Sequence, residues 1–260
     1  MILIITSCIN TPITKGLGAK DPKVRLNAVI EGLSYMLETR IFDKIVICDN
    51  SNYNFSKNEL QGLVKKWEGV KLELLSFLGN SDMVKIRGKG YGECEIMQYI
   101  LENSKLLKDE THFFKITGKL YVTNIHDIIS KINKGGNYMN ITPLKFLGAI
   151  DSRFLYIDKR SYQQILNYLF VHVDDRKMLW YEICLRDALK TFNISFKQWP
   201  VFPIIRGLSG TQGKDPFEVD CLFKWSVFLS RLGIYNSKFG QITTYLLLKT
   251  SSMFKKLISN

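Results

Sequence analysis

Two segments of this chain combine glycines and cations in a way that suits anion binding. The first runs Lys85-Ile-Arg-Gly-Lys-Gly-Tyr-Gly-Glu93, and the second runs Phe113-Phe-Lys-Ile-Thr-Gly-Lys119. Glycine lets backbone amides approach a ligand closely, and a helix N-terminus adds positive potential. We expect the first segment to be a loop that enters a helix near Gly92, and the second to end a strand. Both are candidate phosphate sites; the alternative for each is an ordinary turn with lysines in solvent.

Alternating apolar and amphipathic stretches predict the elements that would position these segments. Continuous apolar runs such as Ile2–Cys8 are typical of strands buried on both faces, and Asp21-Pro22 is a good helix start. The repeated strand-helix order predicts a largely parallel sheet of nucleotide-binding type. We expect strands at 2–8, 44–48, 70–76 and 112–116, and helices at 21–40, 56–67 and 92–107.

Polar residues follow three of these expected strands. They are Thr6-Ser7-Cys8, Asp49-Asn50-Ser51 and Thr117-Gly118-Lys119. Ligands of open parallel sheets bind beyond the carboxyl ends of the strands, so these residues are expected at one edge. Asp49 suits a ribose hydroxyl or a base edge, but Asp-Asn-Ser is equally good turn composition.

The second half mixes element types. Strands are expected at 138–142, 154–157 and 194–199, helices at 161–170 and 179–191, and helical, aromatic-rich sequence from about residue 216. We therefore predict a catalytic domain over 1–215 and a C-terminal helical extension over 216–260. Arg206, with the glycine-rich Ser209-Gly-Thr-Gln-Gly213, forms a late loop that could close over phosphates; a plain surface loop is the alternative.

Carboxylates of the middle segment are candidate general bases. A base that takes a proton from an acceptor hydroxyl could be Asp151, Asp174 or Glu182, and the rest must be structural. Asp174-Asp175 could also bind a metal, but adjacent carboxylates more often cap a helix start. His112, His126 and His172 lack metal-ligand spacing, as do the five cysteines, which read as buried thiols in a reducing compartment.

Bulk properties favour polyanionic partners. The 260 residues carry 36 Lys plus Arg against 24 Asp plus Glu, a formal net charge of +12 spread along the chain. The apolar N-terminus reads as a first strand and not as a signal peptide, and no run reaches the length of a membrane span. We expect a cytoplasmic protein. Its basic, apolar tail (245–258) is a candidate contact with the inner face of an anionic membrane; packing on the catalytic domain is the alternative.

Four motifs of this chain can be compared with known families: Gly88-Lys-Gly-Tyr-Gly-Glu93, Phe114-Lys-Ile-Thr-Gly-Lys119 with a later Asn124, Asp151-Ser-Arg-Phe, and Ser-Gly-Thr-x-Gly. Together they resemble a group of small GT-A-like bacterial glycosyltransferases of surface polysaccharide assembly (capsule, O-antigen or lipooligosaccharide). The resemblance covers roughly residues 1–213. It implies an α/β, GT-A-like fold with a mixed, mostly parallel sheet flanked by helices. It also implies a nucleotide-sugar donor over the N-terminal half and a glycan acceptor, expected to be lipid-linked, over the second half.

The resemblance also implies residue roles. Where the wider family keeps a metal-binding Asp-x-Asp, this chain has Thr117-Gly118-Lys119, so we expect transfer without a bound metal, with Lys119 offsetting the charge of the departing diphosphate. We assign catalysis to Glu182, Asp151 and Lys119; donor binding to Thr6, Ser7, Asp49, Asn50, Lys89, Gly90, Tyr91, Thr117, Gly118 and Arg206; and acceptor binding to Arg153, Asp174 and Ser209.

Two other functions compete with sugar transfer. A sugar-phosphate nucleotidyltransferase shares this sheet type but normally has metal-binding carboxylates and an N-terminal glycine-rich loop, for which Lys15-Gly-Leu-Gly18 is a poor candidate. A nucleic-acid-binding protein would explain the net charge, but no basic helix or stacking motif stands out, so no nucleic-acid partner is expected.

Overall fold

The computed structural model describes most of the chain. The described residues are 1–11, 18–55, 62, 69–141, 149–209, 213–216, 221–240, 242–244 and 246. The helix expected at 56–67, the middle of the late glycine-rich loop (210–212), the Lys15-Gly-Leu part of the N-terminal loop and nearly all of the basic tail at 245–258 lie outside them.

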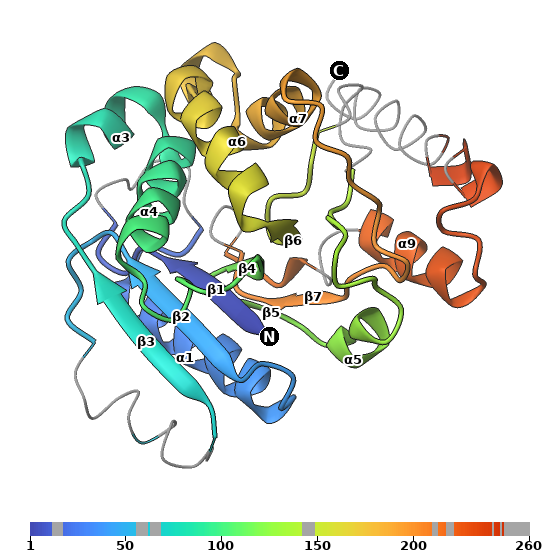
Figure 1. The fold of residues 1–260 in the computed structure, drawn as a ribbon, viewed down its shortest axis with the longest axis horizontal. Coiled ribbons are helices and arrows are strands. Elements are labelled where there is room, and N and C mark those ends of the chain that lie inside the picture. The colour runs from blue at the N-terminus through green and yellow to red at the C-terminus, as the bar shows by residue number, and fades with distance from the viewer. Residues whose placement is uncertain are drawn as a thin grey trace, which may run out of the picture.

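A five-stranded sheet forms the centre of the molecule (Figure 1). Its strands lie in the order β3-β2-β1-β4-β6, and the first four run parallel while β6 runs antiparallel to β4. The expected mixed, mostly parallel sheet is confirmed. The strands are β1 (Ile2–Ser7), β2 (Lys44–Asp49), β3 (Lys71–Ser76), β4 (His112–Thr117) and β6 (Phe154–Asp158).

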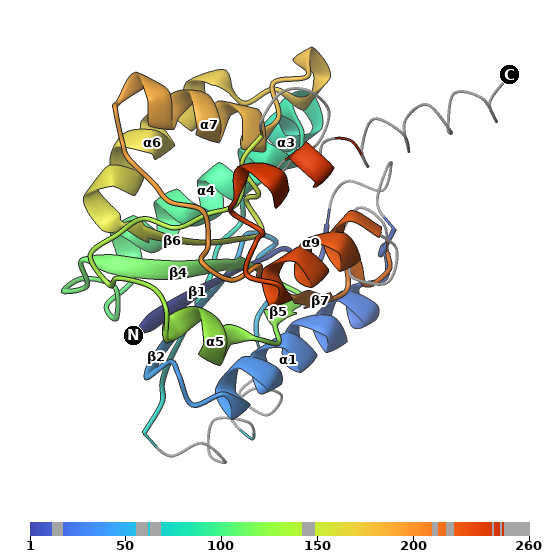
Figure 2. The same cartoon turned by 90° about the vertical axis from the view of Figure 1, so that its right-hand side faces the viewer.

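Helices cover both faces of this sheet (Figure 2). One face carries α1 (Pro22–Glu38), which starts where expected because Asp21 caps it and accepts from the amide of Lys23. Also on this face are α5 (Ile125–Ile129) and α9 (Cys221–Arg231). The opposite face carries α4 (Lys89–Asn103), preceded by α3 (Ser81–Arg87), together with α6 (Lys159–His172) and α7 (Tyr181–Thr191).

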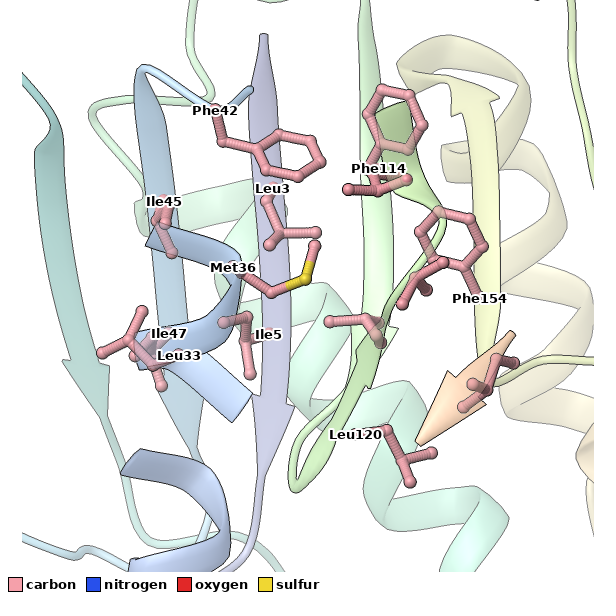
Figure 3. Packing of buried hydrophobic residues seen from close by; sticks show 14 of the residues in the cluster. Leu3, Ile5, Leu33, Met36, Phe42, Ile45, Ile47, Phe114, Leu120 and Phe154 are labelled. Carbon is pink, nitrogen blue, oxygen red and sulfur yellow. The ribbon is translucent and has the colours of Figure 1, made fainter. Parts of the chain in front are cut away.

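Alternation along the strands divides the core into two clusters. On β1, Leu3 and Ile5 face α1, while Ile2 and Ile4 face α4 and its neighbours. Burial on both faces explains the continuous apolar runs of these strands. Figure 3 shows the α1 side, where Leu33 and Met36 lie against the strands and residues of β4 and β6 continue the layer. The central strands therefore provide a rigid base for the loops at their carboxyl ends.

Two strands expected in the second half do not form. Segment 138–141 and segment 194–199 make only isolated bridges: Tyr138 pairs with Tyr156 and with Lys197. Their aromatic content serves packing instead, since the fully buried Trp199 stacks on Tyr138 and Phe154 at the edge of the sheet. This aromatic layer explains why strand-like composition gave a wrong prediction here.

A second, two-stranded sheet lies beside the main one. It pairs β5 (Leu120–Val122) with β7 (Ile205–Gly207) antiparallel, so part of the expected late loop is a strand. Helix α9 contacts the segment before β7: the amide of Phe202 donates to Ser230 Oγ, and Phe202 packs edge-on against Tyr235. The domain boundary at 215 stays a prediction. Within the described residues, no helix has both the length and the apolarity needed to cross a bilayer.

Candidate active site

The strand order reverses direction at β1, which lies between β2 and β4. Ligands of such sheets bind at this switch point, beyond the carboxyl ends of the strands. Register brings the three expected polar segments together there: Ser7 pairs with Asp49, and Thr6 pairs with Thr117. The turn after β4 approaches β1 closely at this point: the Gly118 amide donates to the Thr6 carbonyl at 2.6 Å, and a Cβ on Gly118 would lie 2.2 Å from that oxygen.

Lys119 follows directly and is the most unusual residue of the site. Its backbone has φ 74°, in the left-handed region that residues other than glycine rarely adopt, and only 8% of the residue is exposed. Among the described residues its ammonium makes no hydrogen bond and no ion pair. Burial, followed by the nearby charge of Arg25, lowers the pKa of Lys119 to about 8. A buried cation in this state is a strong candidate for anion binding.

A buried ion pair between Lys115 and Glu93 lies beside the same turn. Lys115, 1% exposed, lies 2.5 Å from Glu93 Oε1 and also donates to Thr117 Oγ1 at 3.2 Å and to the Ser152 carbonyl at 2.9 Å. These three bonds use all the protons of the ammonium. Glu93 also accepts from Thr6 Oγ1 at 3.0 Å. We expected Glu93 at the start of a helix; instead it ties α4 to the ends of β1 and β4.

The candidate bases differ in how they are held. Asp151 is clamped by Arg153, with Nε–Oδ1 at 2.8 Å and Nη2–Oδ2 at 2.7 Å. Burial alone would raise the pKa of Asp151, but the charge and hydrogen bonds of Arg153 outweigh it and the pKa is lowered. Glu182, in the first turn of α7, is half-buried and accepts from Ser152 Oγ at 2.8 Å. Among the described residues, one carboxylate oxygen of Glu182 therefore has no hydrogen-bond partner, whereas both oxygens of Asp151 are bound by one guanidinium.

The loop expected at residues 85–92 is instead two helices. Helix α3 ends at Arg87, and Gly88, with φ 95°, separates it from α4. Helix α4 begins at Lys89, three residues before the expected Gly92. The N-terminus of α4 already has an anion: the Asp175 carboxylate accepts hydrogen bonds from the amides of Lys89 and Gly90. A Cβ on Gly88 would lie 2.1 Å from Asp175 Oδ2, so this glycine admits the carboxylate.

Other side chains of this segment also bind within the protein. Arg87 donates to the Val173 carbonyl at 2.8 Å and to the Val171 carbonyl at 3.0 Å, at the end of α6. The ring of Tyr91 packs edge-on against Phe170 and lies under the Arg87 guanidinium at 5.0 Å. These contacts indicate a structural junction at 87–91. The diphosphate contact that we expected from Lys89, Gly90 and Tyr91 stays a prediction, and the charge of Lys89 is close enough to Lys119 to help lower its pKa.

The residues at the end of β2 build the neighbouring loops. Asp49 is fully buried; its Oδ2 accepts from the Ile9 amide at 2.8 Å, and its Oδ1 accepts from the amide and hydroxyl of Ser51. The turn interpretation therefore describes its geometry. Asn50 donates to the Gly92 carbonyl at 3.4 Å, while its Oδ1 is buried without a partner. Ser7 Oγ is buried without a partner as well.

Three other expected contacts lie within local networks. Arg206 Nε lies 2.6 Å from Asp215 Oδ2, so its charge is matched across the β7 turn. Asp174 caps the short 3-10 helix Asp175–Lys177, accepting from the Arg176 amide. The Ser209 amide donates to the Lys214 carbonyl. The structure brings Thr6, Thr117, Gly118, Lys119, Arg153, Asp151 and Glu182 around the switch point through shared contacts, and it gives Arg206, Ser209 and Asp174 separate structural partners.

Sequence reasoning missed Arg25, Lys115 and Ser152. Arg25 lies on α1, 5% exposed, and donates through Nε to the Cys8 carbonyl at 2.7 Å and through Nη1 to the Ala19 carbonyl at 3.1 Å. A signal for Arg25 existed, since an arginine among the apolar positions of an amphipathic helix is rarely buried without a reason. Lys115 interrupts the apolar run of β4 in the same way.

The described residues contain no group of three or more His, Cys, Asp or Glu side chains arranged to hold a metal ion. The chemistry that they do offer is a buried cation (Lys119) and a carboxylate (Glu182). Hydrogen bonds through Lys115 and Ser152 connect Glu182 to Thr117, two residues before Lys119. A fixed cation can stabilise negative charge that develops on a leaving group, and a carboxylate can accept a proton from a nucleophile.

No protein-family model and no curated protein matches this chain. Solved structures do match it. The glycosyltransferase GlyE of Streptococcus pneumoniae TIGR4 is 8% identical with TM-score 0.45, over 76% of this chain and 44% of GlyE, so the chain spans less than half of that protein. The galactosyltransferase LgtC, solved with donor and acceptor sugar analogs, is 8% identical with TM-score 0.46, over 73% of this chain and 70% of LgtC.

A nucleoside-diphosphate-sugar pyrophosphorylase of Vibrio cholerae RC9 is 10% identical with TM-score 0.47, over 76% of this chain and 91% of that protein.

Proposed function

We propose that the protein is a glycosyltransferase that moves a sugar from a nucleotide-diphosphate donor to a glycan acceptor. The observation that carries this proposal is Lys119, a buried cation at the switch point with no protein partner among the described residues. In transfer, the bond between the sugar carbon and the diphosphate oxygen breaks, and negative charge grows on that oxygen. Lys119 offsets this charge, the task that a divalent ion performs in other enzymes.

We assign the base to Glu182. The acceptor hydroxyl gives its proton to the carboxylate as its oxygen forms the new bond to the sugar carbon. The free oxygen of Glu182 supports this choice, and the Ser152 hydroxyl holds the other one at 2.8 Å. Asp151, whose pKa is lowered by the Arg153 clamp, instead orients Arg153 for the acceptor. Direct attack with a separate base corresponds to inversion at the sugar carbon.

We propose further that the acceptor is a lipid-linked glycan of a bacterial surface polysaccharide and that the enzyme works at the inner face of the membrane. The motif resemblance supports this setting, and the net charge of +12 favours an anionic surface. Thr6, Ser7 and the loop organised by Asp49 would border the nucleoside, since they lie beside Lys119 at the same sheet edge.

The test is turnover of nucleotide sugars by the full chain with EDTA present. Release of nucleoside diphosphate from one donor, raised by a glycan acceptor, is the expected result. Release of pyrophosphate from a nucleoside triphosphate plus a sugar phosphate would instead identify a nucleotidyltransferase. Thermal stabilisation by DNA or RNA alone, with no turnover of any donor, would overturn both enzyme proposals. Glu182→Gln should lower kcat with little change in the donor KM.

A further inference from the structure

The buried Arg25 side chain and the turn that carries the buried Lys119 are bonded to the same short segment at the end of β1. Arg25 donates to the carbonyl of Cys8, and the turn that carries Lys119 is bonded through the Gly118 amide to the carbonyl of Thr6. Arg25, on α1, therefore bonds to segment 6–8 through its side chain, and Lys119, after β4, follows the Gly118 backbone amide that bonds to the same segment. The charge of Arg25 is close enough to contribute to the low pKa of Lys119.

Neither cation forms an ion pair in the described part of the chain, although the charge of Asp49 acts on Arg25 and the charge of Glu93 acts on Lys119. Arg25 binds only two backbone carbonyls, through Nε and Nη1, and forms no ion pair. Both carboxylate oxygens of Asp49, on the adjacent strand, already accept hydrogen bonds, from the amides of Ile9 and Ser51 and from the Ser51 hydroxyl. Two like charges removed from water are costly unless an anion joins them.

In the described part of the chain, the third guanidinium nitrogen of Arg25, Nη2, has no hydrogen-bond partner and can bind such an anion. The two backbone carbonyls hold the planar guanidinium of Arg25 in place, so the side chain loses little conformational entropy when a ligand binds. Ser7, 6% exposed and placed between Thr6 and Cys8, adds a buried hydroxyl that has no partner. An orphaned buried hydroxyl is costly, which also favours a ligand at this position.

We propose that Arg25 and Lys119 form a two-cation cradle that binds both phosphates of a diphosphate, with Lys119 on one phosphate and Arg25 on the other. The inference rests on the proposed function and deepens it, because it assigns the second phosphate of the donor to Arg25, a residue on α1. Arg25 also helps to explain how a site without a metal-binding carboxylate pair holds two negative charges.

The test measures binding of inorganic pyrophosphate and of orthophosphate to the full chain by calorimetry, in EDTA at pH 7. The unmodified protein should bind pyrophosphate at least about tenfold more tightly than orthophosphate, since each added charge-assisted contact is of that order. Arg25→Met and Arg25→Lys should lose most of this preference and keep the orthophosphate affinity within about threefold, because Lys119 remains. Arg160→Met, an exposed arginine on α6, is the matched control and should behave like the unmodified protein.

Equal affinity of the unmodified chain for the two anions would overturn the cradle, and this measurement needs no variant. Loss of both anions in equal proportion in Arg25→Lys would also overturn it, because that result describes an arginine that only supports the loop. Turnover separates the two proposals. A chain that turns over a nucleotide sugar with Arg25→Lys unimpaired loses only the cradle. A chain that prefers pyrophosphate through Arg25 but turns over no donor loses only the transferase proposal.

Discussion

The two glycine-and-lysine segments, 85–93 and 113–119, have similar composition but opposite roles. In the first, Arg87 donates to the carbonyls of Val173 and Val171, and Asp175 accepts from the first amides of α4. In the second, Lys115 is fully paired, but Lys119 has no hydrogen-bond or ion-pair partner among the described residues. The first segment binds a carboxylate of the same chain, Asp175. The second has a cation, Lys119, with which no described residue forms an ion pair.

This difference shows why positive potential alone does not identify a phosphate site. A helix N-terminus attracts a carboxylate of the same chain as readily as a phosphate, and such a cap stabilises the fold. Glycine serves both cases, because Gly88 makes room for the Asp175 carboxylate and Gly118 makes room for the Thr6 carbonyl. What separates a binding site from a structural junction is a buried charge left without a protein partner.

The sharpest way to break this comparison is to remove one lysine from each segment. Lys119→Met should lower kcat for donor cleavage roughly 100- to 1,000-fold, because it removes the fixed charge opposite the leaving group. Lys85→Met is the matched control: Lys85 is exposed and, of the residues that the structure describes, pairs only with Asp82, so activity should be unchanged. Steady-state kinetics with EDTA measures both.

The unfolding midpoint of Lys119→Met should not fall, because a methionine buries the same stem without the cost of desolvating a charge. Near-normal kcat in Lys119→Met, or equal losses in the two variants, would end the distinction between the segments.

The second prediction concerns the structural segment. Gly88→Ala should lower the free energy of unfolding by about 2–3 kcal/mol, because alanine is strained at φ 95° and its methyl would meet Asp175 Oδ2. Asp175→Ala should cost about 1 kcal/mol through loss of the cap on α4. The double variant should cost less than the sum of the two, since the clash is then absent. Urea unfolding measures all three. Strict additivity would contradict this account of Gly88, and loss of donor binding in Asp175→Ala would return α4 to the site.

The sheet could be predicted from sequence because its cause is local and repetitive. Strands β1, β2 and β4 are buried on both faces, so runs such as Ile2–Ile5 are continuously apolar, and the polar residues that follow them fall in register. Lys119 was found by the same logic, as a cation directly after a strand. The strands predicted near Tyr138 and Trp199 were wrong because aromatic residues are favoured both in strands and in ring stacking.

Contacts between distant segments could not be predicted. Nothing near Gly88 indicates that Asp175, 87 residues later, would supply the anion for α4. The same holds for Ser152 with Glu182, and for Arg25, whose partners are backbone carbonyls and leave no trace in a motif. Single charged residues in apolar patterns, such as Lys115 in β4 and Arg25 in α1, were the local signs of these buried groups.

The last prediction uses the pKa of Lys119. Its ordinary value is 10.5, and burial followed by the charge of Arg25 lowers it to about 8, so the free protein loses this proton as the pH rises through 8. An anion binds the protonated form, so binding raises the pKa again and takes up a proton. Affinity for pyrophosphate should therefore fall by about tenfold for each pH unit above 8, until the ordinary titration range of lysine is reached.

Lys119→Arg keeps its charge throughout this range and should show a flat profile between pH 7 and 9.5, even where its affinity is lower. Calorimetry in two buffers of different ionisation enthalpy counts the protons taken up. A sloping profile in Lys119→Arg would assign the titration to another group. A flat profile in the unmodified protein would mean that the ammonium beside Arg25 is not the group that meets the anion, and the contrast between the two segments would then lose its physical cause.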